Sequence, residues 1–99
     1  MSTLVDLSIF PLDKGESVSP YVARAVSVIE KSGLPFRVGP MGTSIEGEWE
    51  DVMAVVNRCF EALKTDCHRV VVHLKMDYRK GAPGRITKKV RSVQEKLNR

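Results

Sequence analysis

Two histidines, which could act as general acids or bases, are among the candidate functional residues of this 99-residue chain. His68 and His73 stand in no recognised nucleophile motif with a serine or cysteine. We expect His73 on the polar face of a strand, where an isolated histidine more often forms structural hydrogen bonds than acts as a base. The histidines therefore indicate no catalytic site.

Carboxylates are the second source of possible chemistry. Glu46 and Glu48 are two positions apart, so they would share a strand face and could serve acid–base catalysis or hold a metal. Arg37 and Lys75 are expected on the same polar side of the sheet, and opposite charges across strands commonly form structural ion pairs. We favour ion pairs and expect no enzyme; catalysis through Glu46, Asp77 or His73 is an alternative.

Cysteines and glycines add no further site. Cys59 and Cys67 are the only cysteines, too few for a disulfide framework and too far apart for a zinc site. Cys59 falls on the apolar side of a predicted helix, where a free thiol acts as a small hydrophobe. Residues 39–42 (GPMG) lack the glycine spacing of a phosphate-binding loop and read as a turn. We expect no cofactor and no metal.

The charge is uneven along the chain. The net charge is +4, and residues 85–99 contain six Lys or Arg against one acidic residue. Such a run is more often the solvated side of a terminal helix than a binding patch, and it lacks interleaved aromatic residues, so nucleic-acid binding is a minority interpretation. No apolar run approaches the about 20 residues of a membrane helix, and no signal peptide is apparent, so we expect a cytoplasmic protein that binds no membrane.

Periodicity predicts the elements that would position these residues. An alternating strand at 3–10 should end its pairing at Pro11, and a helix with Ser19 as N-cap should follow. Two short strands around the turn should then pair as a hairpin, either through a two-residue loop that opposes Val38 to Ile45 or through a four-residue loop. Both registers place Arg37 and Glu46 on one face of the sheet.

The second half repeats the pattern. Glu50 and Asp51 suit the start of a second helix with a clean apolar stripe, and residues 69–79 form the longest strand. A third helix follows with a narrow apolar stripe at Ile86, Val90, Val93 and Leu97. The order βαββαβ predicts one α+β domain over residues 1–99, a ferredoxin-like sandwich with an additional C-terminal helix. That helix has no place in the minimal fold, so its stripe should bury against the sheet or another subunit.

Four segments together carry a family resemblance. They are residues 5–11 (VDLSIFP), 17–22 (SVSPYV), 41–53 (MGTSIEGEWEDVM) and 69–79 (RVVVHLKMDYR). In order and spacing the chain resembles the small ferredoxin-like thiamine-binding proteins of bacteria, archaea and yeast. The resemblance implies a protomer that assembles into homodimers, usually paired into homotetramers. It also implies non-catalytic binding of thiamine or its hydroxymethylpyrimidine part, for sequestration, salvage or sensing.

The residues can be matched to such a ligand. An aminopyrimidine needs an apolar or aromatic wall and a few hydrogen-bonding groups at its edge. For the wall we expect Phe10, Tyr21 and Met41. For the edge contacts we expect Ser19, Thr43, Ser44 and Glu46, the last also favouring the thiazolium cation. An oligomeric interaction or regulatory module without a small-molecule ligand is the alternative function.

Overall fold

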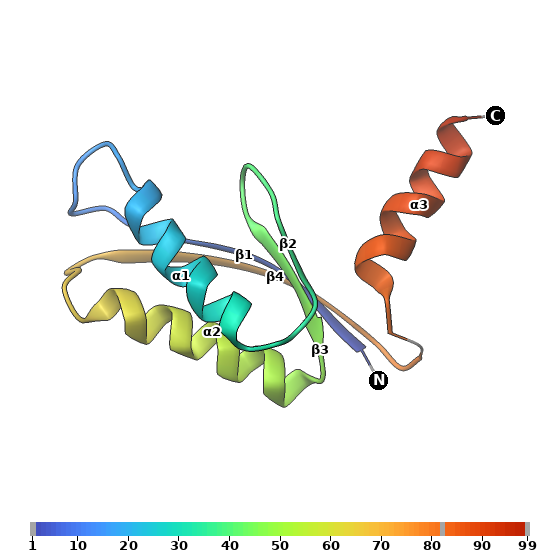
Figure 1. Cartoon of the computed structure of the whole chain (residues 1–99), viewed down its shortest axis with the longest axis horizontal. Helices are drawn as coiled ribbons and strands as arrows, with labels where there is room; N and C mark the ends of the chain where they lie inside the picture. Colours follow the sequence, from blue (N-terminus) through green and yellow to red (C-terminus); the bar gives the residue numbers. More distant parts are fainter. Residues whose placement is uncertain (1, 82, 99) are drawn as a thin grey trace.

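The computed structural model describes residues 2–81 and 83–98, and its elements follow the order βαββαβα (Figure 1). The elements are β1 (Ser2–Pro11), α1 (Ser19–Lys31), β2 (Phe36–Val38), β3 (Thr43–Gly47), α2 (Trp49–Lys64), β4 (Val70–Arg79) and α3 (Arg85–Leu97).

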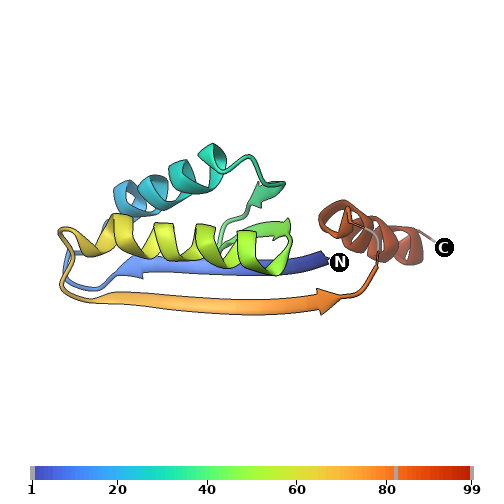
Figure 2. The ribbon, with the colours of Figure 1, turned by 90° about the horizontal axis from the view of Figure 1, so that it is seen from below.

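The four strands form one antiparallel sheet in the order β2-β3-β1-β4. The central strand β1 pairs along its whole length with β4, and Val5 lies opposite Ile45 of β3. Helices α1 and α2 cover the same face of this sheet, which Figure 2 shows edge-on. The predicted ferredoxin-like sandwich is therefore confirmed. Within residues 2–81 and 83–98, no helix lies along the other face of the sheet. We call that side the open face.

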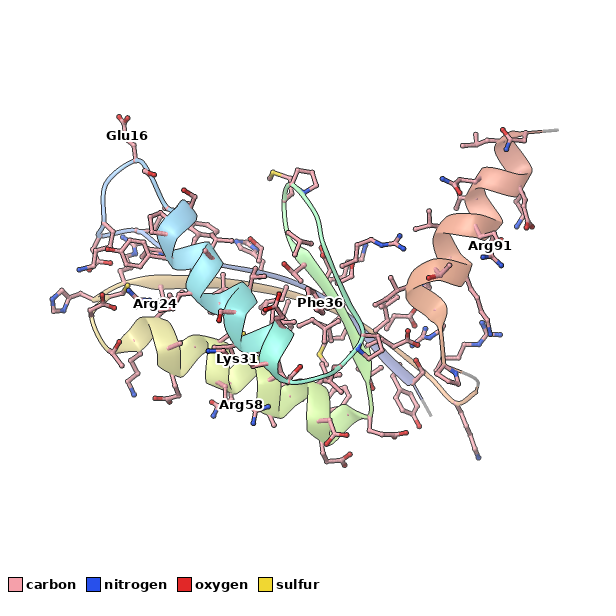
Figure 3. The ribbon with its side chains drawn as sticks, in the orientation of Figure 1. Glu16, Arg24, Lys31, Phe36, Arg58 and Arg91 are labelled. Carbon is pink, nitrogen blue, oxygen red and sulfur yellow. The ribbon has the colours of Figure 1, made fainter. Side chains whose placement is uncertain are left out.

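The core lies between the sheet and the two helices. Its side chains come from the alternating positions of the strands and from the apolar stripes of α1 and α2, as the periodicity predicts. The buried apolar residues are Val5, Leu7, Ile9, Ala25, Ile29, Ile45, Val52, Val55, Val56, Cys59, Leu63 and Cys67. Arg24 also joins the helices at their edge, because its guanidinium donates to the Asp66 carboxylate at 2.6 Å (Figure 3).

The β2–β3 hairpin has the four-residue turn. Val38 lies opposite Thr43, and the backbone N–H of Gly39 donates to the carbonyl of Gly42 at 2.8 Å. A Cβ on Gly42 would lie only 3.0 Å from Oδ1 of Asp6, so a glycine lets the turn pack closely against β1. Arg37 and Glu46 share the open face, as both candidate registers predicted.

Two predicted boundaries were wrong. Pro11 belongs to β1 and lies opposite Val70, which a proline can do at the end of a strand. Ser19 is the first residue of α1 and not its N-cap; Val18 occupies the cap position without a side-chain hydrogen bond. The N–H groups of Tyr21 and Val22 instead both donate to the carbonyl of Val18, so the backbone starts the helix.

Helix α3 projects from one end of the sheet and has few contacts beyond its first turn (Figures 1 and 2). Its apolar stripe is exposed: Val93 and Leu97 retain 59% and 77% of their accessible surface. The radius of gyration is 14.6 Å, whereas about 13 Å is usual for a compact domain of this length. The described part of the chain has no helix with the length and apolarity needed to span a membrane.

Candidate ligand-binding site

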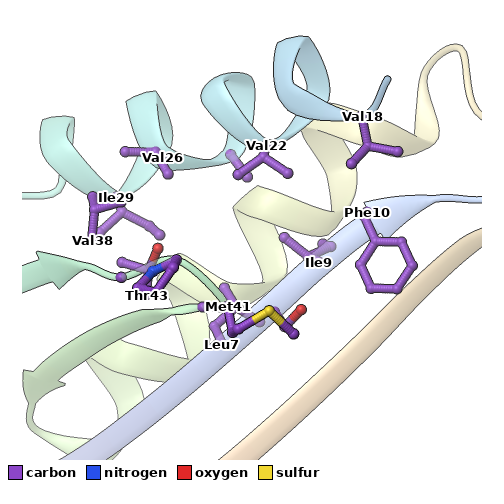
Figure 4. A pocket seen from close by; sticks show the side chains of 15 residues that line it. Leu7, Ile9, Phe10, Val18, Val22, Val26, Ile29, Val38, Met41 and Thr43 are labelled. Atoms are coloured by element: carbon purple, nitrogen blue, oxygen red, sulfur yellow. The ribbon is translucent and has the colours of Figure 1, made fainter. Parts of the chain in front are cut away.

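An apolar cavity of about 310 Å³ lies between α1, the end of β1 and the β2–β3 turn (Figure 4). Its walls combine core residues with residues of the turn. They are Leu7, Ser8, Ile9, Phe10, Val18, Val22, Ala25, Val26, Ile29, Val38, Gly39, Pro40, Met41, Gly42 and Thr43.

The periodicity of α1 builds one wall of this cavity. Val18, Val22 and Val26 follow at intervals of four, so they lie on one side of the helix and point toward β1 (Figure 4). Met41, at the tip of the turn, lies across from them and keeps 86% of its surface exposed. A flexible thioether side chain at the mouth can adapt to a ring that enters.

The lining is chemically simple. Thr43 contributes a hydroxyl group on the cavity side of the sheet, whereas strand alternation turns the Ser8 side chain toward the open face. No charged side chain is among the described residues that form the lining. Such a cavity favours a neutral, flat, mainly apolar group with one or two hydrogen-bonding atoms at its edge. A cationic ring would gain no opposite charge there.

Three predicted site residues meet at this cavity: Phe10, Met41 and Thr43. Thr43 is buried on the helix-covered face of β3, and Met41 belongs to the turn beside it. By the alternation of strand residues, Phe10 lies on the open face of the sheet, and its ring stacks on that of His73 with 6.5 Å between ring centroids.

The other predicted residues lie elsewhere. Ser19 is exposed in the first turn of α1, and the ring of Tyr21 packs on the core edge beneath the Arg24 guanidinium, 5.1 Å from its centroid. Ser44 is on the open face between Asp6 and Arg37 of the neighbouring strands. None of these residues lines the cavity.

Glu46 holds the third helix to the sheet. Its carboxylate is 3% exposed on the open face and receives hydrogen bonds from Ser2 Oγ at 2.7 Å and from the N–H groups of Gly84 and Arg85 at 2.9 and 3.1 Å. The N–H of Ile86 is a longer, fourth donor at 3.4 Å. Together these donors include the otherwise unpaired N–H groups at the start of α3, and the helix dipole favours the negative charge. We call this arrangement the Glu46 anchor.

The pKa of Glu46 reflects two opposing effects. Burial raises this pKa, but the hydrogen bonds from Ser2 and from the backbone of Arg85, Ile86 and Gly84 outweigh it, so the pKa lies below its ordinary value. Glu46 is therefore ionised at neutral pH. It also borders a shallower hollow of about 580 Å³ between β2, the start of α2 and the start of α3.

Arg85 completes the attachment of α3. Its guanidinium, 4% exposed, donates to the carbonyl of Ser2 at 2.8 Å and pairs with the Asp77 carboxylate at 3.0 Å. Lys89 pairs with the same carboxylate. The ammonium of Lys89, and after it the guanidinium of Arg85, holds the pKa of Asp77 below its usual range. Asp77 thus pairs with two cations of α3, whereas the cations predicted to neutralise the sheet carboxylates were Arg37 and Lys75.

Within residues 2–81 and 83–98, no three His, Cys, Asp or Glu side chains come together in a way that could hold an ion. Both thiols are buried, and burial raises the pKa of Cys59 to about 11. The lining of the cavity offers apolar contacts and hydrogen bonding to a bound group.

Sequence reasoning missed the valines of α1 and Ser8. The signal was present, because Val18, Val22 and Val26 follow the helical period beside the turn that carries Met41. Strand parity also separates Thr43 from Ser44 and Glu46, since neighbouring residues of a strand face opposite sides. One cavity on one side of the sheet cannot use all three side chains.

The fold and cavity define a small ferredoxin-like α+β protein with an apolar pocket beside its first helix. A family model described as "Thiamine-binding protein" matches residues 5–94 of this chain. The chain belongs to this thiamine-binding protein family.

Individual relatives agree with the assignment. A UPF0045 protein of Mycobacterium tuberculosis is 43% identical over 100 residues, which cover all of this chain and 98% of that protein. A crystal structure of a hypothetical protein from Methanocaldococcus jannaschii is 34% identical, with a TM-score of 0.87 over 95% of this chain and 97% of the other. A Thermotoga maritima structure described as a candidate thiamine biosynthesis/salvage protein is 28% identical, with a TM-score of 0.83 over 94% and 99%.

Proposed function

We propose that this protein binds thiamine, or a hydroxymethylpyrimidine related to it, without transforming it chemically. The observation that carries the proposal is the apolar cavity beside α1, which gathers Phe10, Met41 and Thr43 in a member of the thiamine-binding family. Sequestration, salvage or sensing in the cytoplasm are roles that such binding would serve.

The cavity suits the pyrimidine part of the ligand better than the thiazolium part. Its volume of about 310 Å³ is near the lower end of ligand pockets, which span about 300–1,000 Å³. Apolar walls would cover the faces of a neutral aminopyrimidine ring, and the hydroxyl of Thr43 would meet its polar edge. The thiazolium cation would then lie toward the open mouth near Met41, where water can solvate the charge.

Isothermal titration calorimetry with thiamine and with hydroxymethylpyrimidine tests this proposal. We expect saturable binding of both, with most of the affinity retained by hydroxymethylpyrimidine alone. Val22→Phe should fill the cavity from α1 and weaken binding of both ligands by at least about tenfold, because the ring and the added side chain compete for the same volume.

Ala54→Phe is the matched control, because it introduces the same side chain at an exposed position of α2. It should bind both ligands as the unaltered protein does. Absence of heat from either ligand at millimolar concentration, or equal binding by Val22→Phe and Ala54→Phe, would overturn the assignment of this cavity. Turnover of thiamine into another product would overturn the non-catalytic part.

We also propose that the protein self-associates to a homodimer or homotetramer. The apolar stripe of α3 supports this proposal, since Val90, Val93 and Leu97 are 43%, 59% and 77% exposed on a helix that projects from the body. On the open face, Leu4, Phe10 and Val71 are half-buried among polar side chains. A second copy could cover either surface.

Sedimentation analysis tests self-association. We expect a mass that is a multiple of 11.1 kDa, and we expect Val93→Asp to shift it toward the monomer because a charge is costly in an apolar contact. Ala54→Asp makes the same change at an exposed position of α2 and serves as the control. A monomeric unaltered protein would refute the proposal. Association that fails to bind either ligand would favour the interaction module instead.

A further inference from the structure

A basic hollow of about 440 Å³ lies where the end of β4 meets α3, on residues that the ligand cavity does not use. The residues that form this basic hollow are Arg79, Lys80, Gly81, Arg85, Lys88, Lys89 and Ser92. Five of these seven are Lys or Arg, and none of the described residues in the lining is acidic.

The helical period explains how α3 contributes its part. Arg85, Lys88, Lys89 and Ser92 are spaced i, i+3, i+4 and i+7, so they form one side of α3, separate from its apolar stripe. The contacts of Arg85 with Ser2 and Asp77 hold this side of the helix against the end of β4. The Glu46 anchor fixes the same turn of α3, so the basic hollow is already formed without a ligand.

The positive charge in the basic hollow exceeds the negative charge paired with it. The one Asp77 carboxylate pairs with both Arg85 and Lys89, and Lys88 Nζ donates to the carbonyl of Pro83. From position 79 onward the chain has eight Lys or Arg and one acidic residue, whereas the first 78 residues have eight basic and eleven acidic ones. Like charges gathered in one concavity repel one another, and an anion would relieve that repulsion.

From this geometry we infer that the basic hollow binds a compact multivalent phosphate, such as a diphosphate or triphosphate group. Lysine ammonium groups act as point charges for phosphate oxygens, and the Arg79 guanidinium can donate two parallel hydrogen bonds to them. The Ser92 hydroxyl adds a neutral donor. The hollow is enclosed by only two short segments and lacks an aromatic ring in its lining, so it fits a small anion better than a polynucleotide, which uses extended basic grooves and base stacking.

Titration with inorganic diphosphate and triphosphate, followed by calorimetry and by ³¹P NMR at low salt, tests this inference. We expect saturable binding with one site per chain, stronger for triphosphate than for orthophosphate, and weaker as salt is raised. The double variant Arg79→Gln/Lys88→Gln should weaken diphosphate binding by at least about tenfold, because it removes two charge-assisted contacts. Circular dichroism should show an unchanged fold, since Arg79 and Lys88 are both exposed.

Arg91→Gln together with Arg58→Gln is the matched control. It removes the same charge from positions outside the basic hollow, on α3 and on α2 (Figure 3), and should leave diphosphate affinity within about twofold. An equal loss in both double variants would show diffuse attraction and overturn the site. Absence of saturable binding to diphosphate and triphosphate at millimolar concentration would overturn it as well, as would polynucleotide binding that diphosphate does not displace. Thiamine binding should be the same in all these variants, so the proposal for the cavity and the inference for the basic hollow can be tested independently.

Discussion

Replacing Glu46 with glutamine separates two roles for this residue: contact with a ligand and attachment of α3. The substitution keeps the size of the side chain and removes its charge. In the structure the carboxylate receives three hydrogen bonds of 2.7–3.1 Å from Ser2 Oγ and the N–H groups of Gly84 and Arg85. The cavity beside α1 lies on the other face of the sheet and does not include Glu46.

The expected cost follows from these contacts. A neutral amide oxygen can still accept the three hydrogen bonds, but each is about half as strong without the charge, a loss of roughly 1 kcal/mol apiece. The side-chain NH2 group of glutamine would take the place of the oxygen that accepts from the N–H of Ile86, so two hydrogen-bond donors would face each other. Because glutamine avoids burying a charge, part of this loss is recovered. We expect a net loss of about 2 kcal/mol in the free energy that keeps α3 docked.

Amide hydrogen exchange measures this free energy locally. The N–H of Lys88 donates to the carbonyl of Gly84 in the first turn of α3, so it exchanges when that turn opens. A loss of about 2 kcal/mol should lower its protection by about 30-fold. Glu61→Gln, an exposed change on α2, should leave the protection unaltered. Binding of thiamine should survive Glu46→Gln.

The same anchor predicts a pH dependence. Because the pKa of Glu46 is lower in the folded protein than in the unfolded chain, its stabilising contribution is present above the unfolded pKa. It disappears as the pH falls through the lower folded pKa. The difference in protection between the unaltered protein and Glu46→Gln should therefore be full at neutral pH and vanish in acid. Unchanged protection of α3 in Glu46→Gln, together with lost thiamine binding, would refute the anchor and restore Glu46 as a ligand residue.

Three further predictions concern the turn and the core. Gly42→Ala should destabilise the fold by about 1–3 kcal/mol in urea unfolding, because its Cβ would crowd Asp6, whereas Gly81→Ala meets no atom within 4 Å and should cost far less. Equal unfolding midpoints for the two variants would contradict the packing of the turn. Burial raises the pKa of Cys59 to about 11, so a disulfide reagent at pH 8 should label it only as the protein unfolds; rapid labelling in the native state would count against this burial. Leu63→Ala should cost about 2–5 kcal/mol in the same unfolding assay, since Leu63 is fully buried; a cost below about 1 kcal/mol would argue against its core position.

The sheet could be predicted from sequence because strand alternation constrains it strongly. Val5, Leu7 and Ile9 can face the helices only if their neighbours face the opposite side, and Ile45, which lies opposite Val5 in β3, shares their face. The same alternation places Arg37 and Glu46 on one face of the sheet for a two-residue loop and for a four-residue loop alike. The starting residue of α1 was harder to predict, because the backbone carbonyl of Val18 and not the Ser19 hydroxyl begins the helix.

The candidate site was predicted only in part. Phe10, Met41 and Thr43 line the cavity, and their contact with a ligand stays a prediction. Ser44 was also predicted as an edge contact, but it points to the opposite side of the sheet from Thr43, since adjacent strand residues alternate between the two faces. The cavity depends on the distance between α1 and the turn, and a single sequence does not encode that distance in any local pattern.

The sequence by itself determined the order of elements, the side of the sheet that each strand residue faces, and the two apolar stripes that close the core. Those features follow from local periods of two and 3.6 residues, which require no knowledge of distant contacts. Only the tertiary structure decided what Glu46 and the residues after position 79 do. Residues 38 positions or more apart come together there, because one buried carboxylate meets the start of α3. That meeting point depends on long-range hydrogen bonding and charge complementarity, which no local sequence period encodes.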